Sequence, residues 1–182
     1  STGQFMTVST DSFLQLSDEL RRLKPAEILL TPDFPQKEAV EALAASSGAV
    51  ISVVEDAPGL ARASETLLRH FQVSSLTVFG LRNAPEILAA GLALKYVQDT
   101  QRGVLSHIRA VASYKLEEFL QIDGHSSRNL ELTQTIREGK KTGSLLGVLD
   151  YTVTSMGARL LKSYLEKPLV DLEIIEARHA AV

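Results

Sequence analysis

The stretch Gly139-Lys140-Lys141-Thr142 is the part of this sequence that comes nearest to a phosphate-binding loop. Such a loop requires G-x-x-x-x-G-K-[ST], because its backbone N–H groups surround the phosphates and its terminal hydroxyl binds magnesium. Here Gln134 stands where the first glycine is required, and Lys141 stands in the hydroxyl position. The pattern therefore fails at two positions, and we interpret the stretch as a solvated basic loop between helices.

Glu55 and Asp56 directly follow an apolar run that resembles a strand. Many α/β enzymes carry catalytic carboxylates at this position. Adjacent residues of a strand point to opposite faces, so these two carboxylates are poorly placed to act together. We expect a polar turn at this position.

Asp123 and His125 could form an acid–base pair, but they stand just before a predicted helix. Ser126 and Ser127 are good N-cap residues, so we expect capping at this position. The histidines are scattered without the i, i+4 spacing of a helical metal site. They are His70, His107, His125 and His179. We therefore expect no catalytic, cofactor-binding or metal-binding residue in this chain.

The composition is that of a globular protein, with 182 residues, 45% of them hydrophobic, and a net charge of −3. The length suggests one domain and part of another, and we expect the chain to be a piece of a longer protein. The absence of cysteine excludes disulfides, thiolate zinc sites and cysteine nucleophiles. The lack of cysteine fits a reducing cytosol, so we expect a cytoplasmic protein. No apolar run approaches the roughly 18 residues of a membrane span, so we expect no membrane contact.

Short β-rich runs alternate with amphipathic helical runs up to about residue 102, which predicts an α/β layer fold. Strands are predicted at 4–8, 27–30 and 49–54, and helices at 11–24, 36–47, 60–71 and 84–97. The run at 49–54 is continuously apolar, which is typical of a strand buried on both faces. The helix at 84–97 carries only two charges, Glu86 and Lys95, so we expect it to pack on more than one side.

The character of the sequence changes between residues 103 and 114. A mixed, extended segment at 114–122 is followed by predicted helices at 128–138, 144–149, 155–166 and 172–181. We therefore expect an α/β domain at 1–106 and a helical segment at 107–182.

Several distinctive stretches are spread along the chain. They are STGQF at 1–5, the helix and exit at 83–102 and 105–108, the stretch 123–132, LLGVLD at 145–150, TVT at 152–154, MGARL at 156–160 and KPL at 167–169. Taken together, these stretches resemble the MutS family of DNA mismatch-recognition ATPases, and 123–169 is the most specific part. Tyr164 and Ser126 depart from the residues that are common in the family.

The resemblance implies that 1–106 is a connector domain of ribonuclease-H-like α/β fold whose first strand precedes Ser1, and that 107–182 begins the helical core and lever domain. It also implies a longer, dimeric parent that binds mismatched duplex DNA, ATP and magnesium through domains outside this segment. In that parent, the connector would transmit the ATP and DNA state and dock a MutL-like protein, with no catalysis and no cofactor of its own.

We predict the MutL-like contact on the polar face of the 60–71 helix, at Arg62, Glu65 and Arg69, and weak phosphate contacts at Arg137, Lys140 and Lys141. The alternative is a metal-dependent nuclease of ribonuclease-H type, which would bring three or four acids together. A nucleic-acid-binding module is a third option, disfavoured by the charge of −3 and the absence of tryptophan.

Overall fold

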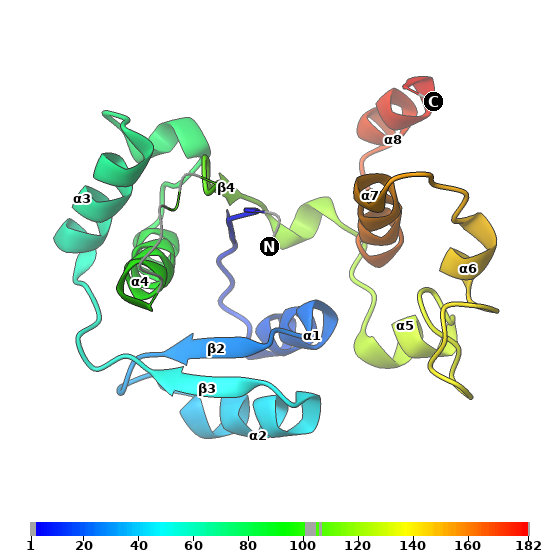
Figure 1. Cartoon of the computed structure of the whole chain (residues 1–182), viewed down its shortest axis with the longest axis horizontal. Coiled ribbons are helices and arrows are strands. Elements are labelled where there is room, and N and C mark those ends of the chain that lie inside the picture. The colour runs from blue at the N-terminus through cyan, green and yellow to red at the C-terminus, as the bar shows by residue number, and fades with distance from the viewer. Residues whose placement is uncertain (1–2, 101–104, 106, 182) are drawn as a thin grey trace. The chain divides into compact units, whose positions relative to one another are not determined.

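The computed structural model describes residues 3–100, 105 and 107–181, and the chain divides into two compact units (Figure 1). The first unit comprises Ser1–Ser17 and Lys24–Lys115, and the second comprises Asp18–Leu23 and Leu116–Val182. Residues 1–2 of the STGQF stretch, and residue 106 at the predicted domain boundary, lie outside the described residues, so that boundary stays a prediction.

The first unit contains a βαβ arrangement in which β2 (Glu27–Leu30) and β3 (Val50–Val53) pair in parallel through their whole length. Helix α2 (Lys37–Ser47) connects the two strands, as a parallel pair requires. It ends at Gly48, which has a φ of 74° and donates its N–H to the Ala44 carbonyl. Glycine adopts this left-handed conformation without the steric cost that a Cβ brings.

The expectation that residues 49–54 form a strand buried on both faces is wrong. Val50 is 61% exposed and Val53 is 38% exposed. Helix α2 contacts β3, and Val40 and Ala44 of that helix are buried. A strand that is covered by a helix on one face can still consist of consecutive β-branched residues. The length of an apolar run therefore does not tell whether one or both faces of the strand are buried.

A second parallel pair joins β1 (Met6–Thr7) to β4 (Ala112–Ser113), and the latter strand was not predicted. Helix α4 (Ala84–Thr100) contacts β1, and helix α3 (Leu60–Phe71) contacts α4 and the 3₁₀ turn η1 (Leu76–Phe79). Helix α4 contacts both α3 and β1, which confirms that it packs on more than one side. The hydrophobic core around this helix consists of Leu67, Leu76, Leu81, Ala90, Leu94, Leu105 and Val111.

Helix α1 (Phe13–Leu23) is shared by the two units, because Phe13–Ser17 belongs to the first and Asp18–Leu23 to the second. Arg21 and Arg22 lie in its last turn, where cations interact favourably with the negative end of the helix dipole. Pro25 follows after Lys24, in agreement with the predicted end of this helix.

The second unit is helical, and a side-chain oxygen caps the first turn of four of its helices. The elements are η2 (Leu116–Glu118), α5 (Gly124–Asn129), α6 (Leu145–Leu149), α7 (Ser155–Glu166) and α8 (Leu172–Ala180). The caps are Asp123, Ser144, Thr154 and Asp171, each of which accepts a backbone N–H. The predictions for 144–149, 155–166 and 172–181 are confirmed. The guanidinium carbon of Arg178 lies 4.0 Å from the Tyr164 ring centroid, which links α8 to α7.

The predicted helix at 128–138 is wrong, since α5 ends at Asn129 and turns follow up to residue 143. Glu131 has a φ of 48°, and its carboxylate accepts the N–H of Ile136 at 2.6 Å. This side-chain contact gives the backbone an alternative to helical hydrogen bonds. The predicted extended segment at 114–122 is also interrupted, because η2 lies within it.

Within the part of the chain that the structure describes, no helix combines the length and the apolar character needed to cross a membrane.

Candidate partner-binding face

Helix α3 separates an apolar face from a charged face. Ala63 and Leu67 are fully buried, and a Cβ added to Gly91 of α4 would lie only 2.7 Å from the Ala63 Cα. This close approach places one side of α3 against α4. Residues three or four positions apart share a helix face, so the opposite side presents Arg62, Glu65 and Arg69.

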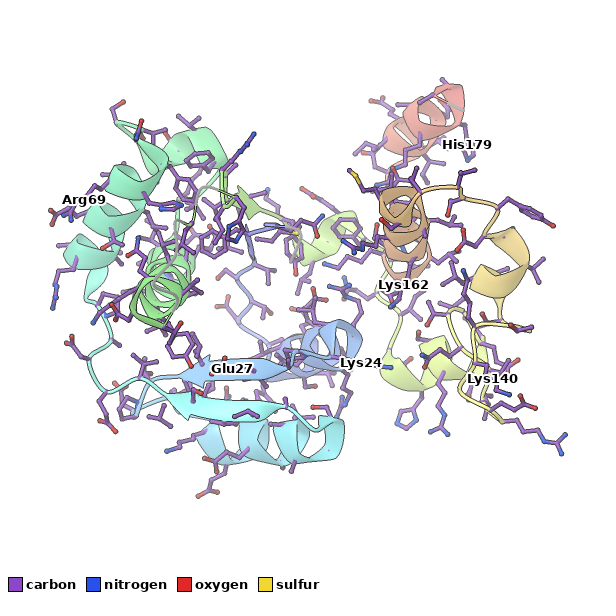
Figure 2. All side chains as sticks on the ribbon, in the orientation of Figure 1. Lys24, Glu27, Arg69, Lys140, Lys162 and His179 are labelled. Carbon is purple, nitrogen blue, oxygen red and sulfur yellow. The ribbon has the colours of Figure 1, made fainter. Side chains whose placement is uncertain are left out.

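The three predicted contact residues lie together on that charged face. The side chains of Arg62, Glu65 and Arg69 are 69%, 68% and 75% exposed. Figure 2 shows Arg69 directed outward from α3. The structure brings the three residues together on one exposed surface, and their role in partner binding stays a prediction.

Charge pairing reduces the net charge of this face. Arg69 donates from Nη2 to Glu65 Oε1 at 2.6 Å, one helical turn away. Arg62 Nη1 lies 3.9 Å from Asp56 Oδ1. Exposed pairs of this kind contribute little to stability, typically below about 1 kcal/mol. The face therefore offers alternating signs of charge rather than a basic or acidic patch.

Asp56 is held by Lys95, one of the two charged residues noted in α4. Lys95 Nζ donates to Asp56 Oδ2 at 2.6 Å and to the Asp56 carbonyl at 2.7 Å. The hydrogen bond and the charge of Lys95, with a smaller contribution from Arg62, lower the pKa of Asp56 below its usual range. Asp56 is thus an ionised anchor at the turn before α3. The expected polar turn at 55–56 is confirmed.

Glu86, the other charge of the predicted 84–97 helix, is buried and accepts the hydroxyl of Ser113 at 2.9 Å. Thr7 lies opposite Ser113 in the β1–β4 pair, and its buried Oγ1 has no hydrogen-bond partner among the described atoms. The hydrogen bond between Ser113 and Glu86 joins β4 to the first turn of α4. Glu86 therefore has a structural role in this unit.

The stretch 139–142 is a loop without helical structure, as expected. Lys140 Nζ lies 2.9 Å from Glu138 Oε2, and Lys141 pairs with Asp150. Arg137 is exposed. Two of the three predicted phosphate-contacting cations are therefore engaged by acids of the same unit, and phosphate contact at Arg137, Lys140 and Lys141 stays a prediction.

Asp150 holds the end of this loop. Its carboxylate accepts hydrogen bonds from Lys141 Nζ and from the Thr152 hydroxyl at 2.5 Å and N–H at 3.1 Å. The bond from Lys141, followed by those from Thr152, lowers the pKa of Asp150 to about 2. The carboxylate is therefore charged through the physiological pH range.

Asp123 is a helix cap, but the capping residue is Asp123 itself and not Ser126 or Ser127. Its Oδ1 accepts the N–H groups of His125 and Ser126, each at 2.9 Å. These bonds and the Ser126 hydroxyl lower the pKa of Asp123, the hydroxyl being the largest cause. Across residues 3–100, 105 and 107–181, no three or more histidine, aspartate or glutamate side chains are grouped to hold a metal ion.

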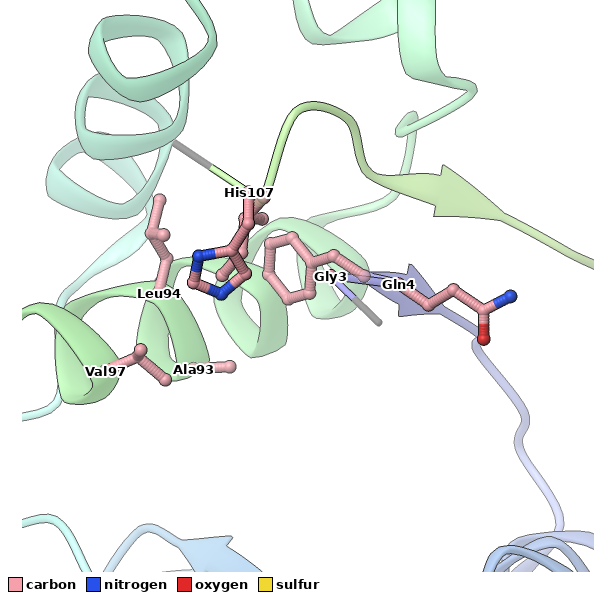
Figure 3. A pocket seen from close by; sticks show the side chains of 8 residues that line it. Gly3, Gln4, Ala93, Leu94, Val97 and His107 are labelled. Atoms are coloured by element: carbon pink, nitrogen blue, oxygen red, sulfur yellow. The ribbon is translucent and has the colours of Figure 1, made fainter. Parts of the chain in front are cut away.

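A cavity of about 360 Å³ opens in the first unit (Figure 3). It is lined by Gly3, Gln4, Phe5, Ala93, Leu94, Val97, His107 and Ile108. Figure 3 shows the His107 ring near Leu94, while the Gln4 side chain points away. Its volume is within the range of ligand sites. The described lining is mainly apolar, with Gln4 and His107 as its polar side chains.

One polar cluster was not predicted from the sequence. Glu27 Oε1 accepts the hydroxyls of Tyr96 and Ser52, each at 2.5 Å, and these bonds lower the pKa of Glu27. Glu27 pairs with Val50 and Ser52 with Leu29, so Glu27 and Ser52 are diagonal neighbours on the same face of the parallel pair. A lone cation in an apolar helix implies an acidic partner, so the sequence indicated that Lys95 would be paired. It did not identify Asp56 as that partner.

Comparison with known proteins accounts for the whole chain. Residues 1–109 match the description of MutS domain II, and residues 125–182 match MutS domain III. The DNA mismatch repair protein MutS of Symbiobacterium thermophilum is 40% identical, and that of Lachnoclostridium phytofermentans is 39% identical. Both alignments cover 100% of this chain.

The chain spans about a fifth of the length of these relatives, 21% and 20% respectively. The DNA mismatch repair protein MutS of Trichodesmium erythraeum is 39% identical, and the chain spans 21% of its length. The resemblance predicted from 123–169 and the earlier stretches is confirmed. The match to MutS domain II alone covers more than half of the residues of this chain. The chain therefore belongs to the MutS family.

Proposed function

We propose that this chain is the connector module, with the start of the core and lever domain, of a MutS-like mismatch-repair protein. In this proposal residues 1–106 have a ribonuclease-H-like fold, and 107–182 begin the helical domain. The observation that carries the proposal is the succession of a domain II match and a domain III match on one chain. The α/β character of the first unit and the helical character of the second are consistent with it.

The proposed role is to transmit the ligand state of the parent and to dock a MutL-like protein. Mismatched duplex DNA, ATP and magnesium would bind domains of a dimeric cytoplasmic parent that lie outside this chain. Each ligand would favour one of two arrangements, so the connector would move as a rigid body between them. The connector would then need a surface that its own fold does not cover, and the charged face of α3 is such a surface.

A capture experiment tests the docking role. The triple variant Arg62→Glu, Glu65→Lys and Arg69→Glu reverses the sign of every charge on the face but keeps positions 65 and 69 oppositely charged. We therefore expect an intact helix, with a stability change within about 1 kcal/mol. Binding to the cognate MutL should fall at least about tenfold, the loss expected when charge complementarity is reversed.

The matched control is Glu38→Lys with Glu41→Lys on the exposed side of α2, in the same unit. This variant should retain MutL capture, and circular dichroism should show both variants folded. Undiminished capture by the triple variant would remove α3 as the docking site. Failure of the unaltered chain to capture MutL would leave the docking role without support.

We further propose that this chain neither binds nor hydrolyses ATP, and that Arg137, Lys140 and Lys141 contribute only weak contacts to phosphate. Titration with a fluorescent nucleotide tests the first statement, since saturable micromolar binding would contradict it. Anisotropy with labelled duplex DNA tests the second, and the weak binding expected should decrease steeply with salt. The matched families give no support to the nuclease alternative.

A further inference from the structure

The charges on the exposed face of α3 are not equally compensated. Glu65 neutralises Arg69, because Arg69 Nη2 donates to Glu65 Oε1 at 2.6 Å. Among the described residues, the acid nearest to the Arg62 guanidinium is Asp56. The distance between Arg62 Nη1 and Asp56 Oδ1 is 3.9 Å, which is longer than a hydrogen bond. Arg62 is therefore the least compensated cation of this face.

The carboxylate of Asp56 is bound by Lys95 rather than by Arg62. Lys95 Nζ donates to Asp56 Oδ2 at 2.6 Å and to the Asp56 carbonyl at 2.7 Å. The hydrogen bond and the charge of Lys95 lower the pKa of Asp56 more than the charge of Arg62 does. The Lys95 side chain is only 24% exposed, whereas that of Arg62 is 69% exposed. Lys95 thus holds Asp56 from α4, and the Arg62 guanidinium remains open to solvent.

One positive charge is left over on this surface. Asp56 and Lys95 form one neutral pair, and Glu65 and Arg69 form another. The charge of Arg62 has no such counterpart, so the surface is locally positive although the whole chain has a net charge of −3. An exposed guanidinium presents planar N–H donors that match a carboxylate with two parallel hydrogen bonds. Arginine is also enriched among the residues that contribute most to protein interfaces.

The acids beside Arg62 restrict what can bind there. Glu65 lies three positions further along α3 and therefore on the same face, and Asp56 lies on the other side of the guanidinium. A nucleic acid presents a row of phosphates and requires several neighbouring cations, which these acids oppose. A protein carboxylate carries a single charge, so one arginine is sufficient to bind it.

We propose that Arg62 is the anchor of the α3 docking surface, that it binds a carboxylate of the MutL-like partner, and that Lys95 keeps it free to do so by holding Asp56. This inference rests on the proposed docking role of α3. Without Lys95, the nearest cation to Asp56 among the described residues is Arg62. The Asp56 carboxylate then closes on Arg62 and competes with the partner. Lys95 is therefore a positioning residue that acts on the partner through Asp56.

Matched arginine variants of the full chain test the anchor, with the Kd for the cognate MutL as the readout. Arg62→Lys keeps the charge but not the two parallel hydrogen bonds, so the Kd should rise at least about fivefold. Arg69→Lys makes the same change in the arginine that Glu65 already binds. It should raise the Kd less than about twofold, since an exposed pair of this kind contributes little. Equal losses in the two variants would overturn the assignment of Arg62 as the anchor.

Lys95→Met tests the positioning role. The Kd should rise at least about threefold, because the Asp56 carboxylate is then free to neutralise Arg62. Asp56→Asn added to Lys95→Met should restore the Kd to within about twofold of the unaltered chain, because a neutral amide competes less for the guanidinium. Glu55→Gln added instead is the matched control, since it removes the neighbouring exposed acid of the same turn. It should leave the loss unrepaired.

Rescue by Asp56→Asn separates positioning from a purely structural role of Lys95. A structural role would give no rescue, and that result would overturn the positioning role. Circular dichroism shows whether each variant folds. If Lys95→Met does not fold, Asp56→Asn alone decides. It should keep the Kd within about twofold, and a larger loss would contradict the proposal.

The anchor and the docking role fail in different experiments. If the triple charge reversal on α3 leaves capture of MutL unchanged, the docking role of α3 is wrong. If the triple reversal abolishes capture while Arg62→Lys and Arg69→Lys behave alike, only the anchor is wrong. Binding of labelled duplex DNA that is lost with Arg62→Met would identify a phosphate as the ligand of this arginine, and would overturn the carboxylate.

Discussion

Gly91 of α4 packs directly against Ala63 of α3, so closely that an added Cβ would lie 2.7 Å from the Ala63 Cα. Ala63 and Gly91 are both buried, and their contact belongs to the α3–α4 interface of the first unit. The absence of a side chain at Gly91 therefore sets the distance between α3 and α4. The exposed charged face of α3 depends on this packing, because it orients the helix.

We expect Gly91→Ala to destabilise the protein although alanine is the better helix former. Overpacking against backbone atoms costs about 1–3 kcal/mol, and the gain in helix propensity is at most about 1 kcal/mol. The net loss should be about 1–2 kcal/mol in denaturant unfolding. Gly59→Ala is the control, because a Cβ there meets nothing within 4 Å. A stabilised Gly91→Ala variant would show that the helices can move apart.

Removal of the Lys95 ammonium should raise the pKa of Asp56. Lys95 supplies the largest contributions to the lowered value, by hydrogen bond and by charge, and Arg62 supplies a smaller one. NMR titration of the Asp56 carboxyl should therefore show a larger upward shift for Lys95→Met than for Arg62→Met. Equal shifts would mean that the contact at 2.6 Å is not maintained in solution.

The loop 139–150 should lose stability only in strong acid. The pKa of Asp150 is lowered from 3.8 to about 2 in the folded protein. A lowered pKa means that the stabilisation is complete above the unfolded value near 3.8 and is lost as the pH falls through about 2. Titration of Asp150 by NMR should show this midpoint, and Lys141→Met should move it upward because Lys141 is the largest cause. A midpoint near 3.8 in the unaltered chain would refute the contact.

The Thr154 cap should be worth about 1 kcal/mol to the second unit. Its hydroxyl accepts the N–H of Gly157 at 3.0 Å in the first turn of α7. Thr154→Ala leaves that N–H without its partner, so thermal unfolding monitored by circular dichroism should shift downward. Ser155→Ala, at the next exposed position, should change the midpoint much less, and equal effects would argue against capping.

Local signals were enough to predict several elements with their bounds. Strand β2 at Glu27–Leu30 and helix α7 at Ser155–Glu166 occur where they were predicted, and α2 ends at Gly48. In each, the determining residues lie within a few positions of one another: a short apolar run before a turn, a threonine cap, or a glycine in a left-handed conformation. Such interactions act before the chain is compact, so they can be read in order along the sequence.

Tertiary structure decided the partners of the charged residues. The sequence singled out Glu86 and Lys95 as lone charges in an apolar helix, but only the fold shows that they meet Ser113 and Asp56, and that Glu19 meets Lys167. It also decided the conformation of 130–143, where the carbonyls of Glu131 and Leu132 accept the N–H groups of Leu145 and Leu146. Contacts between residues far apart in the chain form only when packing brings the elements together. Local propensity therefore determined most elements of this protein, whereas its charged anchors depend on how those elements pack.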